Sequence, residues 1–190
     1  MPDPIHGQSP PPPGLGPIFS LDGVTPQIAP DAFIAPTAAV IGDVTVGSET
    51  GIWFHCLVRG DLQYIRIGAR TNIQDGAIIH VDSGGFSTTI GDDVTVGHNA
   101  VIHACTLKDR AFVGISATVL DGAVIEDGGM LAAGGLLTPG KVIGPNELWA
   151  GTPARLLRVM MPEERKRFDR NAEVYRELAR RFRAGLRSAT

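Results

Sequence analysis

Three histidines that lie close together in the chain, His80, His98 and His103, are the residues best suited to chemistry in this 190-residue sequence. Neutral imidazoles bind divalent transition metals. Three of them with an open fourth position form the zinc arrangement that lowers the pKa of bound water to about 7. Ferrous iron and cobalt accept the same ligands. The three histidines therefore predict a site for Zn2+, with Fe2+ or Co2+ as alternatives, if the fold brings them together.

The elements that must position these histidines follow a six-residue repeat of aliphatic residues. The repeat begins at Ile28 and continues, with short interruptions, to Trp149, and the position four further on holds small residues such as Ala32 and Ala38. Neither the period of a strand nor that of a helix fits this run. An inward aliphatic residue with a small corner residue is typical of a hexapeptide β-helix. We therefore predict an all-β solenoid rather than an antiparallel sandwich, which does not keep one register for so long.

Resemblance to known hexapeptide-repeat proteins adds that three hexads close one triangular turn and that the coil is left-handed. His80 follows Ile79, His103 follows Ile102, and three hexads separate the two aliphatic positions. The two imidazoles should then leave the same face on successive coils, about 4.8 Å apart at the backbone. His98 follows Val96 by two residues and should point off another part of the triangle. A threefold assembly would bring His98 of one chain to the pair of the next, which predicts one metal site per chain at a subunit interface.

The two ends of the chain fall outside the repeat. Residues 1–17 contain a run of prolines and several glycines, and we predict a flexible Pro-rich tail because this composition cannot form a packed core. Residues 18–158 form the predicted β-helix domain, and residues 159–190 the C-terminal helix, which opens near Pro162 with acidic residues in its first turn. An apolar stripe on this helix should pack alongside the solenoid of its own chain or of a neighbour. The stripe comprises Phe168, Ala172, Tyr175, Leu178 or Ala179, Phe182 and Leu186.

The composition indicates which kinds of binding partner and which cellular location to expect. A net charge of -3 gives no argument for nucleic-acid binding. No segment approaches the ~18 apolar residues of a membrane span, and the N-terminus lacks the pattern of a signal peptide, so we expect no membrane insertion and a cytoplasmic location. Cys56 and Cys105 are interpreted as small buried residues or free thiols. Metal ligation by Cys105 stays open because it lies two residues past His103.

Several segments of the chain resemble the γ-class carbonic anhydrase family of hexapeptide proteins, over roughly residues 20 to 180. These segments are Arg59-Gly60-Asp61, Thr71-Asn72-Ile73-Gln74-Asp75-Gly76, Ile79-His80, Val94-Thr95-Val96-Gly97-His98, Ile102-His103-Ala104-Cys105, Val119-Leu120-Asp121-Gly122-Ala123 and Gly151-Thr152-Pro153-Ala154-Arg155. The resemblance implies a left-handed parallel β-helix with a C-terminal α-helix packed alongside, and a homotrimer with metal between subunits. It also implies a lyase activity, the reversible hydration of CO2 to bicarbonate by a metal-bound hydroxide.

The same resemblance implies roles for individual side chains around the metal. Gln74 matches the residue that hydrogen-bonds metal-bound water or bicarbonate, and Asn72 lies two residues earlier on the same strand face. Tyr175 matches a helix position that reaches toward the metal pocket, although it also belongs to the apolar stripe.

The resemblance further implies an ion pair between Arg59 and Asp61 across the subunit interface, with Asp75 close by. A pair of this kind would specify assembly more than it would stabilise it. A salt bridge within one chain is the alternative for Arg59 and Asp61.

Two features depart from the prototype enzyme and keep other functions open. Leu62 stands where the prototype has a glutamate, and the loop 82–89 lacks the acidic residues that relay protons. Hydration requires removal of a proton in every cycle, so loss of the relay should slow turnover. Acyl transfer from coenzyme A, hydrolysis of coenzyme A thioesters, and a non-catalytic metal-binding trimeric scaffold are the competing hypotheses.

Overall fold

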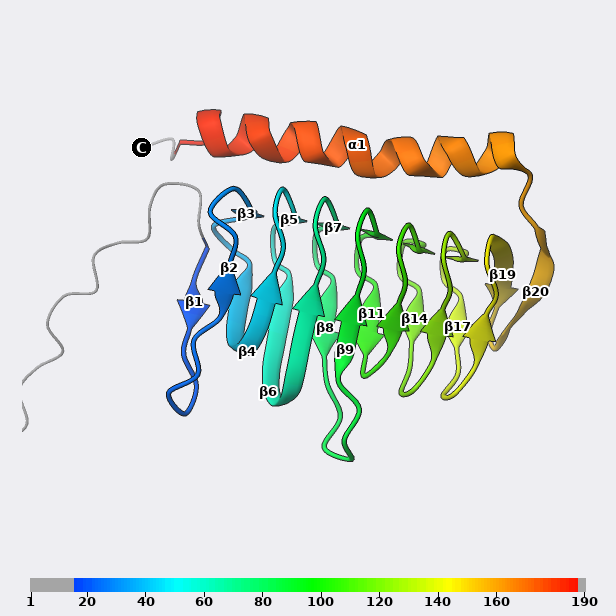
Figure 1. Ribbon diagram of the computed structural model, residues 1–190, viewed down its shortest axis with the longest axis horizontal. Helices are drawn as coiled ribbons and strands as arrows, with labels where there is room; N and C mark the ends of the chain where they lie inside the picture. The colour runs from blue at the N-terminus through cyan, green and yellow to red at the C-terminus, as the bar shows by residue number, and fades with distance from the viewer. Residues whose placement is uncertain (1–15, 188–190) are drawn as a thin grey trace, which may run out of the picture.

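The structure is a computed structural model that describes residues 16–187. The predicted tail, residues 1–17, therefore lies almost wholly outside the described residues. The described chain forms a left-handed parallel β-helix of about 7 turns, and α1 (Pro162–Gly185) runs alongside it (Figure 1). The predicted fold class is confirmed, and the helix starts at the proline that the sequence indicated.

The strands sort into three faces, because each one pairs in parallel with the strand one turn later; among the described strands, β20 alone is added by an antiparallel hairpin to β19. The first face contains β3 (Phe33–Ile34), β5 (Gly51–Ile52), β7 (Asn72–Ile73), β10 (Thr95–Val96), β13 (Phe112–Val113), β16 (Met130–Leu131), β19 (Glu147–Gly151) and β20 (Ala154–Val159). The second face contains β1 (Ile18–Phe19), the first halves of β4 (Ala39–Val46) and β6 (Leu57–Ile67), β8 (Ile78–His80), β11 (Val101–His103), β14 (Thr118–Val119) and β17 (Leu136–Leu137). The third face contains β2 (Gln27–Ile28), the second halves of β4 and β6, β9 (Thr88–Ile90), β12 (Thr106–Leu107), β15 (Val124–Ile125) and β18 (Val142–Ile143).

The aliphatic residues of the repeat fill the interior between the three faces. Ile34, Ile79 and Ile102 are each 0% exposed. Small residues such as Ala38 and Ala100 are equally buried at the corners, where a larger side chain would not fit. The period read from the sequence therefore corresponds to one inward side chain per strand.

The turn that follows β7 shows why a corner can require glycine. Gly76 has a φ of 75°, and a Cβ at this position would lie 2.2 Å from Oδ1 of Asn99 on the next coil. Only glycine combines this φ with the close approach of a neighbouring coil.

Helix α1 covers the first face of its own chain (Figure 1), which identifies the surface that its apolar stripe packs against. Phe182 lies edge-on to Trp53 with ring centroids 5.2 Å apart, and Tyr175 packs on the same indole at 5.4 Å. Further along, Phe168 packs against Phe112 at 5.1 Å. Such aromatic pairs stabilise beyond the area they bury, and they fix the helix over the coils that carry the histidines.

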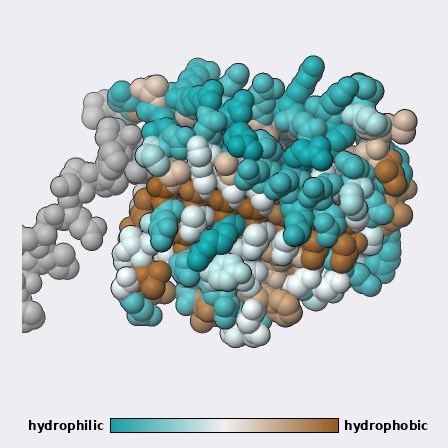
Figure 2. All heavy atoms as spheres, viewed as in Figure 1, coloured by the Kyte–Doolittle hydropathy of each residue, from teal (hydrophilic) through white to brown (hydrophobic). Residues whose placement is uncertain are grey.

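The distribution of hydrophilic and hydrophobic side chains on the surface follows the position of α1. Hydrophilic side chains cover the outer side of α1, and a band of hydrophobic side chains runs below it (Figure 2). Within residues 16–187, no helix combines the length and the apolar character that crossing a membrane requires.

Candidate metal centre

The three histidines lie at two different corners of the solenoid, which bound the second face on its two sides. The first corner joins the first face to the second and includes residues 74–77 and 97–100. The second corner joins the second face to the third and begins at the ends of β8 and β11. His98 belongs to the first corner, whereas His80 and His103 belong to the second.

His80 and His103 are register partners on adjacent strands, as the repeat predicted. Nδ1 of His80 lies 3.3 Å from Nε2 of His103. Two ligands of a tetrahedral metal at ~2.0–2.1 Å are ~3.3–3.4 Å apart, as the geometry of a tetrahedron requires. The two imidazole nitrogens are therefore already at the spacing that one metal ion requires.

The other ring nitrogen of each of these histidines faces a carboxylate. Nε2 of His80 lies 2.9 Å from Oδ1 of Asp61, and Nδ1 of His103 hydrogen-bonds Oδ1 of Asp121. A carboxylate that accepts a ring N–H fixes the tautomer and leaves the opposite nitrogen with a free lone pair for a metal. The two carboxylates thus orient both histidines toward a common point.

The carboxylate of Asp61 is itself held by two side chains, His80 and Arg59. Burial raises the pKa of its carboxyl group, but the hydrogen bond from His80 and the charge of Arg59 outweigh this effect, so the pKa lies below its usual value. Arg59 forms an ion pair with Asp61 inside the chain. This is the alternative considered for the pair, and an ion pair across subunits stays a prediction.

The first corner holds the third histidine between an acid and a phenol. Nδ1 of His98 lies 3.1 Å from Oδ2 of Asp75, and its Nε2 lies 3.3 Å from the hydroxyl oxygen of Tyr175 on α1. Burial raises the pKa of Tyr175, and the charge of Asp75 adds to this effect. Tyr175 therefore both packs in the apolar stripe and contacts a candidate ligand.

Gln74, the first residue of this corner, is connected to Asn72 on the adjoining strand β7 of the first face. The amide of Gln74 donates to Oδ1 of Asn72 at 3.0 Å, and the amide of Asn72 donates to Oγ1 of Thr95 at 2.9 Å. The two side chains are 5% and 2% exposed. They share a strand face, as the sequence predicted, and a buried hydrogen-bonded chain holds Gln74 in place.

The single chain does not bring all predicted residues together. Among residues 16–187 no group of three histidine, cysteine or acidic side chains can hold a metal, because His98 lies at the opposite edge of the second face from His80 and His103. Asp75 contacts His98 and not the pair of Arg59 and Asp61. Each corner therefore carries part of the predicted site.

Two further residues bear on the site. Asp121 was present in the sequence only as part of a family signature. The turn from β11 to β14 has 17 residues, so Asp121 lies one residue past the position opposite His103, and its contact with that ring had to be read from the structure. Cys105 lies in the buried core and burial raises the pKa of its thiol. Because its side chain is enclosed among the core residues and only 1% exposed, the structure removes Cys105 from the candidate ligands.

Fold and site together define a hexapeptide-repeat solenoid that carries a paired-histidine centre. No protein-family profile matches the chain. "Gamma carbonic anhydrase 2, mitochondrial" of Arabidopsis thaliana is 45% identical over 82% of the chain, and the chain spans 58% of the length of that relative. "Carbonic anhydrase" of Geobacillus kaustophilus is 44% identical over 88% of the chain and 91% of its own length. A solved structure of a hexapeptide transferase family protein from Anaplasma phagocytophilum has a TM-score of 0.84 and 45% identity, covering 87% of this chain and 98% of that one.

The chain belongs to the γ-class carbonic anhydrase family, whose activity class is that of the carbonate dehydratase lyases.

Proposed function

We propose that the chain is a metal-dependent carbonic anhydrase that interconverts CO2 and bicarbonate at sites between the subunits of a homotrimer. The observation that carries this proposal is the 3.3 Å spacing of Nδ1 of His80 and Nε2 of His103. Each of these rings is oriented by a carboxylate, and a third histidine lies on the other edge of the same face. This arrangement supports a site that two chains complete.

The second face supports the trimer. Leu57, Ile78 and Val101 stack in register between the two corners and point away from the core, and Ile78 is 42% exposed. A threefold axis would bring the first corner of one chain to the second corner of the next in a closed ring. The apolar column would then be buried, and His98 would reach His80 and His103 of its neighbour.

The donor set fits a divalent metal such as Zn2+, held by His80, His103 and the His98 of a second chain. Such a metal supplies Lewis acidity, which lowers the pKa of a coordinated water to about 7. Asp75 takes the same part for His98 that Asp121 takes for His103, because its carboxylate faces Nδ1 and leaves Nε2 for the metal. Fe2+ and Co2+ accept these ligands as well.

Gln74 is the residue that would steady bicarbonate. Its amide nitrogen uses one N–H on Asn72, which leaves its second N–H and its carbonyl oxygen for substrate. Asn72 is a positioning residue, because it acts through Gln74 rather than on the substrate. Tyr175, whose hydroxyl contacts His98, would close the side of the pocket formed by α1.

The proton produced by hydration has to leave without a dedicated relay. Leu62 is 54% exposed and cannot carry a proton, and the carboxylate of Asp82 is engaged by the backbone N–H of Gly84. We infer that external buffer accepts the proton, so turnover should rise with buffer concentration at constant pH.

The interface site is tested by mixing two inactive variants. His98→Ala and His103→Ala trimers should each lack bound zinc and hydration activity. After co-expression in equal amounts, random assembly should restore about one quarter of the sites, because a site needs His103 from one chain and His98 from its neighbour. Elemental analysis and stopped-flow CO2 hydration, with zinc-loaded and anaerobically iron-loaded protein, measure the two readouts.

A second mixture supplies the control. His80 and His103 come from the same chain, so combining His80→Ala with His103→Ala should restore no site. Restoration in this control, or no restoration in the first mixture, would overturn the shared site. Full metal binding without hydration above the buffer rate in either metal form would instead retire the enzymatic proposal and favour the metal-binding scaffold.

Acyl-group chemistry is the second candidate, because the Anaplasma structure is described as a hexapeptide transferase family protein. A transferase of this kind would use a histidine as general base and would not need metal. Assays with a panel of coenzyme A thioesters, with and without acceptor amines and alcohols, separate transfer and thioester hydrolysis from hydration. Activity that survives complete removal of metal would favour this candidate.

A further inference from the structure

Strand β20 (Ala154–Val159) ends the sheet of the first face and has a strand partner on one side only, the antiparallel β19. Figure 1 shows it at the end of the solenoid, where the chain turns into α1. Every residue from Arg155 to Val159 is exposed. A strand with one free edge presents backbone N–H and C=O groups that can pair with another strand.

The side chains along this edge are unusually apolar for an exposed strand. Leu156, Leu157 and Val159 are 51%, 63% and 62% exposed, and Met161, just beyond the strand, is 69% exposed. They lie on or just after the last strand of the solenoid, whose pairing with β19 shifts by one residue at Leu157. Clustered exposed apolar residues of this kind mark interaction surfaces more often than isolated ones do.

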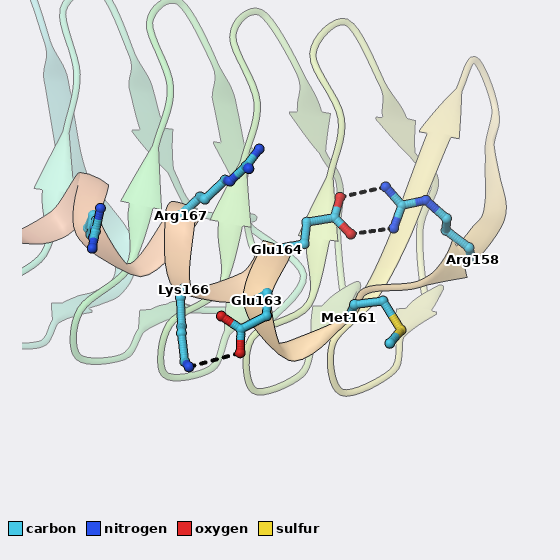
Figure 3. A pocket seen from close by; sticks show the side chains of 7 residues that line it. Arg158, Met161, Glu163, Glu164, Lys166 and Arg167 are labelled. Carbon is cyan, nitrogen blue, oxygen red and sulfur yellow. Dashed lines mark hydrogen bonds and ion pairs between the residues drawn. The ribbon is translucent and has the colours of Figure 1, made fainter.

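Several cationic side chains lie beside the C-terminal end of this strand. A hollow of about 580 Å3 lies between the end of β20 and the first turns of α1 (Figure 3), and it is lined by Arg158, Met161, Glu163, Glu164, Lys166, Arg167 and Arg170. Arg158 pairs with Glu164, and Lys166 pairs with Glu163. Within the described part of the chain, Arg167 and Arg170 form no ion pair, so the hollow keeps an excess of positive charge.

We propose that β20 is a docking edge for an extended segment of a partner protein in which apolar and acidic residues alternate. The backbone of such a segment would pair with the free edge, its apolar side chains would cover Leu157 and Val159, and its carboxylates would reach Arg167 and Arg170. Strand addition of this kind obtains affinity from backbone hydrogen bonds and specificity from alternate side chains.

Two other occupants fit this surface less well. A membrane would leave the free backbone groups unpaired in hydrocarbon, which is strongly unfavourable. A second copy of the chain would bring the same cations of β20 and α1 against each other, and like charges oppose association. Only an extended acidic segment satisfies the backbone, the apolar side chains and the charges together.

The test uses the full chain and a blocked eight-residue peptide of alternating valine and glutamate, with a valine–lysine peptide as its counterpart. We expect the glutamate peptide to bind and the lysine peptide not to bind. Hydrogen exchange should show new protection of backbone amides in β20 when the glutamate peptide is present. Isothermal titration measures the affinity for each peptide.

Variants separate the contributions of charge and apolar contact. Arg167→Gln with Arg170→Gln should weaken binding by about three- to tenfold, as for two exposed charge pairs, and Leu157→Ser with Val159→Ser by about tenfold or more. Arg181→Gln with Arg187→Gln removes the same charge near the C-terminal end of α1, where Arg187 lies two residues past the helix, and should change nothing. No binding of the glutamate peptide, equal binding of both peptides, an equal loss in the control variant, or protection outside β20 would overturn the proposal.

Discussion

Replacing Asp121 by asparagine should weaken metal binding without disturbing the fold. Its carboxylate accepts the Nδ1 proton of His103, and the amide of asparagine would keep the size of the side chain but remove the charge. Loss of such a partner typically costs 10- to 100-fold in metal affinity. Because the side chain of Asp121 is 38% exposed, solvent screening places the expected loss at about tenfold, or ~1.4 kcal/mol. Competition of the protein with a chromogenic zinc chelator measures the dissociation constant directly.

The matched control is Asp127→Asn, which removes the same charge one hexad further along the chain, at an exposed position in the corner between the third face and the first. This variant should bind zinc like the unchanged protein. Light scattering should give the same mass for all three proteins, so that a change in affinity is not caused by a change in assembly. Zinc affinity of the Asp121 variant within twofold of the unchanged protein, or an equal loss in the Asp127 variant, would refute the orienting role of this carboxylate.

Three further predictions concern stability and reactivity. Ile102→Ala removes a fully buried side chain and should lower the free energy of unfolding by about 2–5 kcal/mol in urea denaturation; a loss under 1 kcal/mol would contradict the packed interior. Burial raises the pKa of Cys56 to about 12 and also raises that of Cys105. Neither thiol should therefore react with Ellman's reagent at pH 8 until the protein unfolds. Rapid labelling of the folded protein would be inconsistent with the burial of the two thiols. The hydrogen bond from Arg158 lowers the pKa of Glu164, so Glu164→Gln should reduce thermal stability at neutral pH. This difference in stability should disappear as the pH falls through the lowered pKa of Glu164. A difference that persists in acid would exclude the ion pair as its cause.

The site could be anticipated in part because the repeat encodes register. One aliphatic residue in every six is directed inward, so the positions of His80 and His103 after equivalent aliphatic residues predicted that they would be neighbours on adjacent strands. The same counting placed His98 elsewhere on the triangle. The partner carboxylate Asp121 does not follow from this rule, since it lies one residue past the position that the register places opposite His103.

Contacts between segments far apart in the sequence could not be anticipated in this way. The stripe on α1 predicted that the helix packs on a solenoid but left open which one, and the aromatic contacts with Trp53 and Phe112 decide for its own chain. The contact of Tyr175 with His98 depends on that docking. The contact of Asp75 with His98, by contrast, follows from the register, because the two residues are 23 positions apart, as are His80 and His103.

The sequence by itself determined the solenoid and the pairing of two histidines, because both follow from a short period that repeats the same local geometry on every coil. The tertiary structure decided where the helix lies and that β20 is left with a free edge. These features depend on packing between surfaces that no local period describes, and they determine how a second chain or a partner can approach.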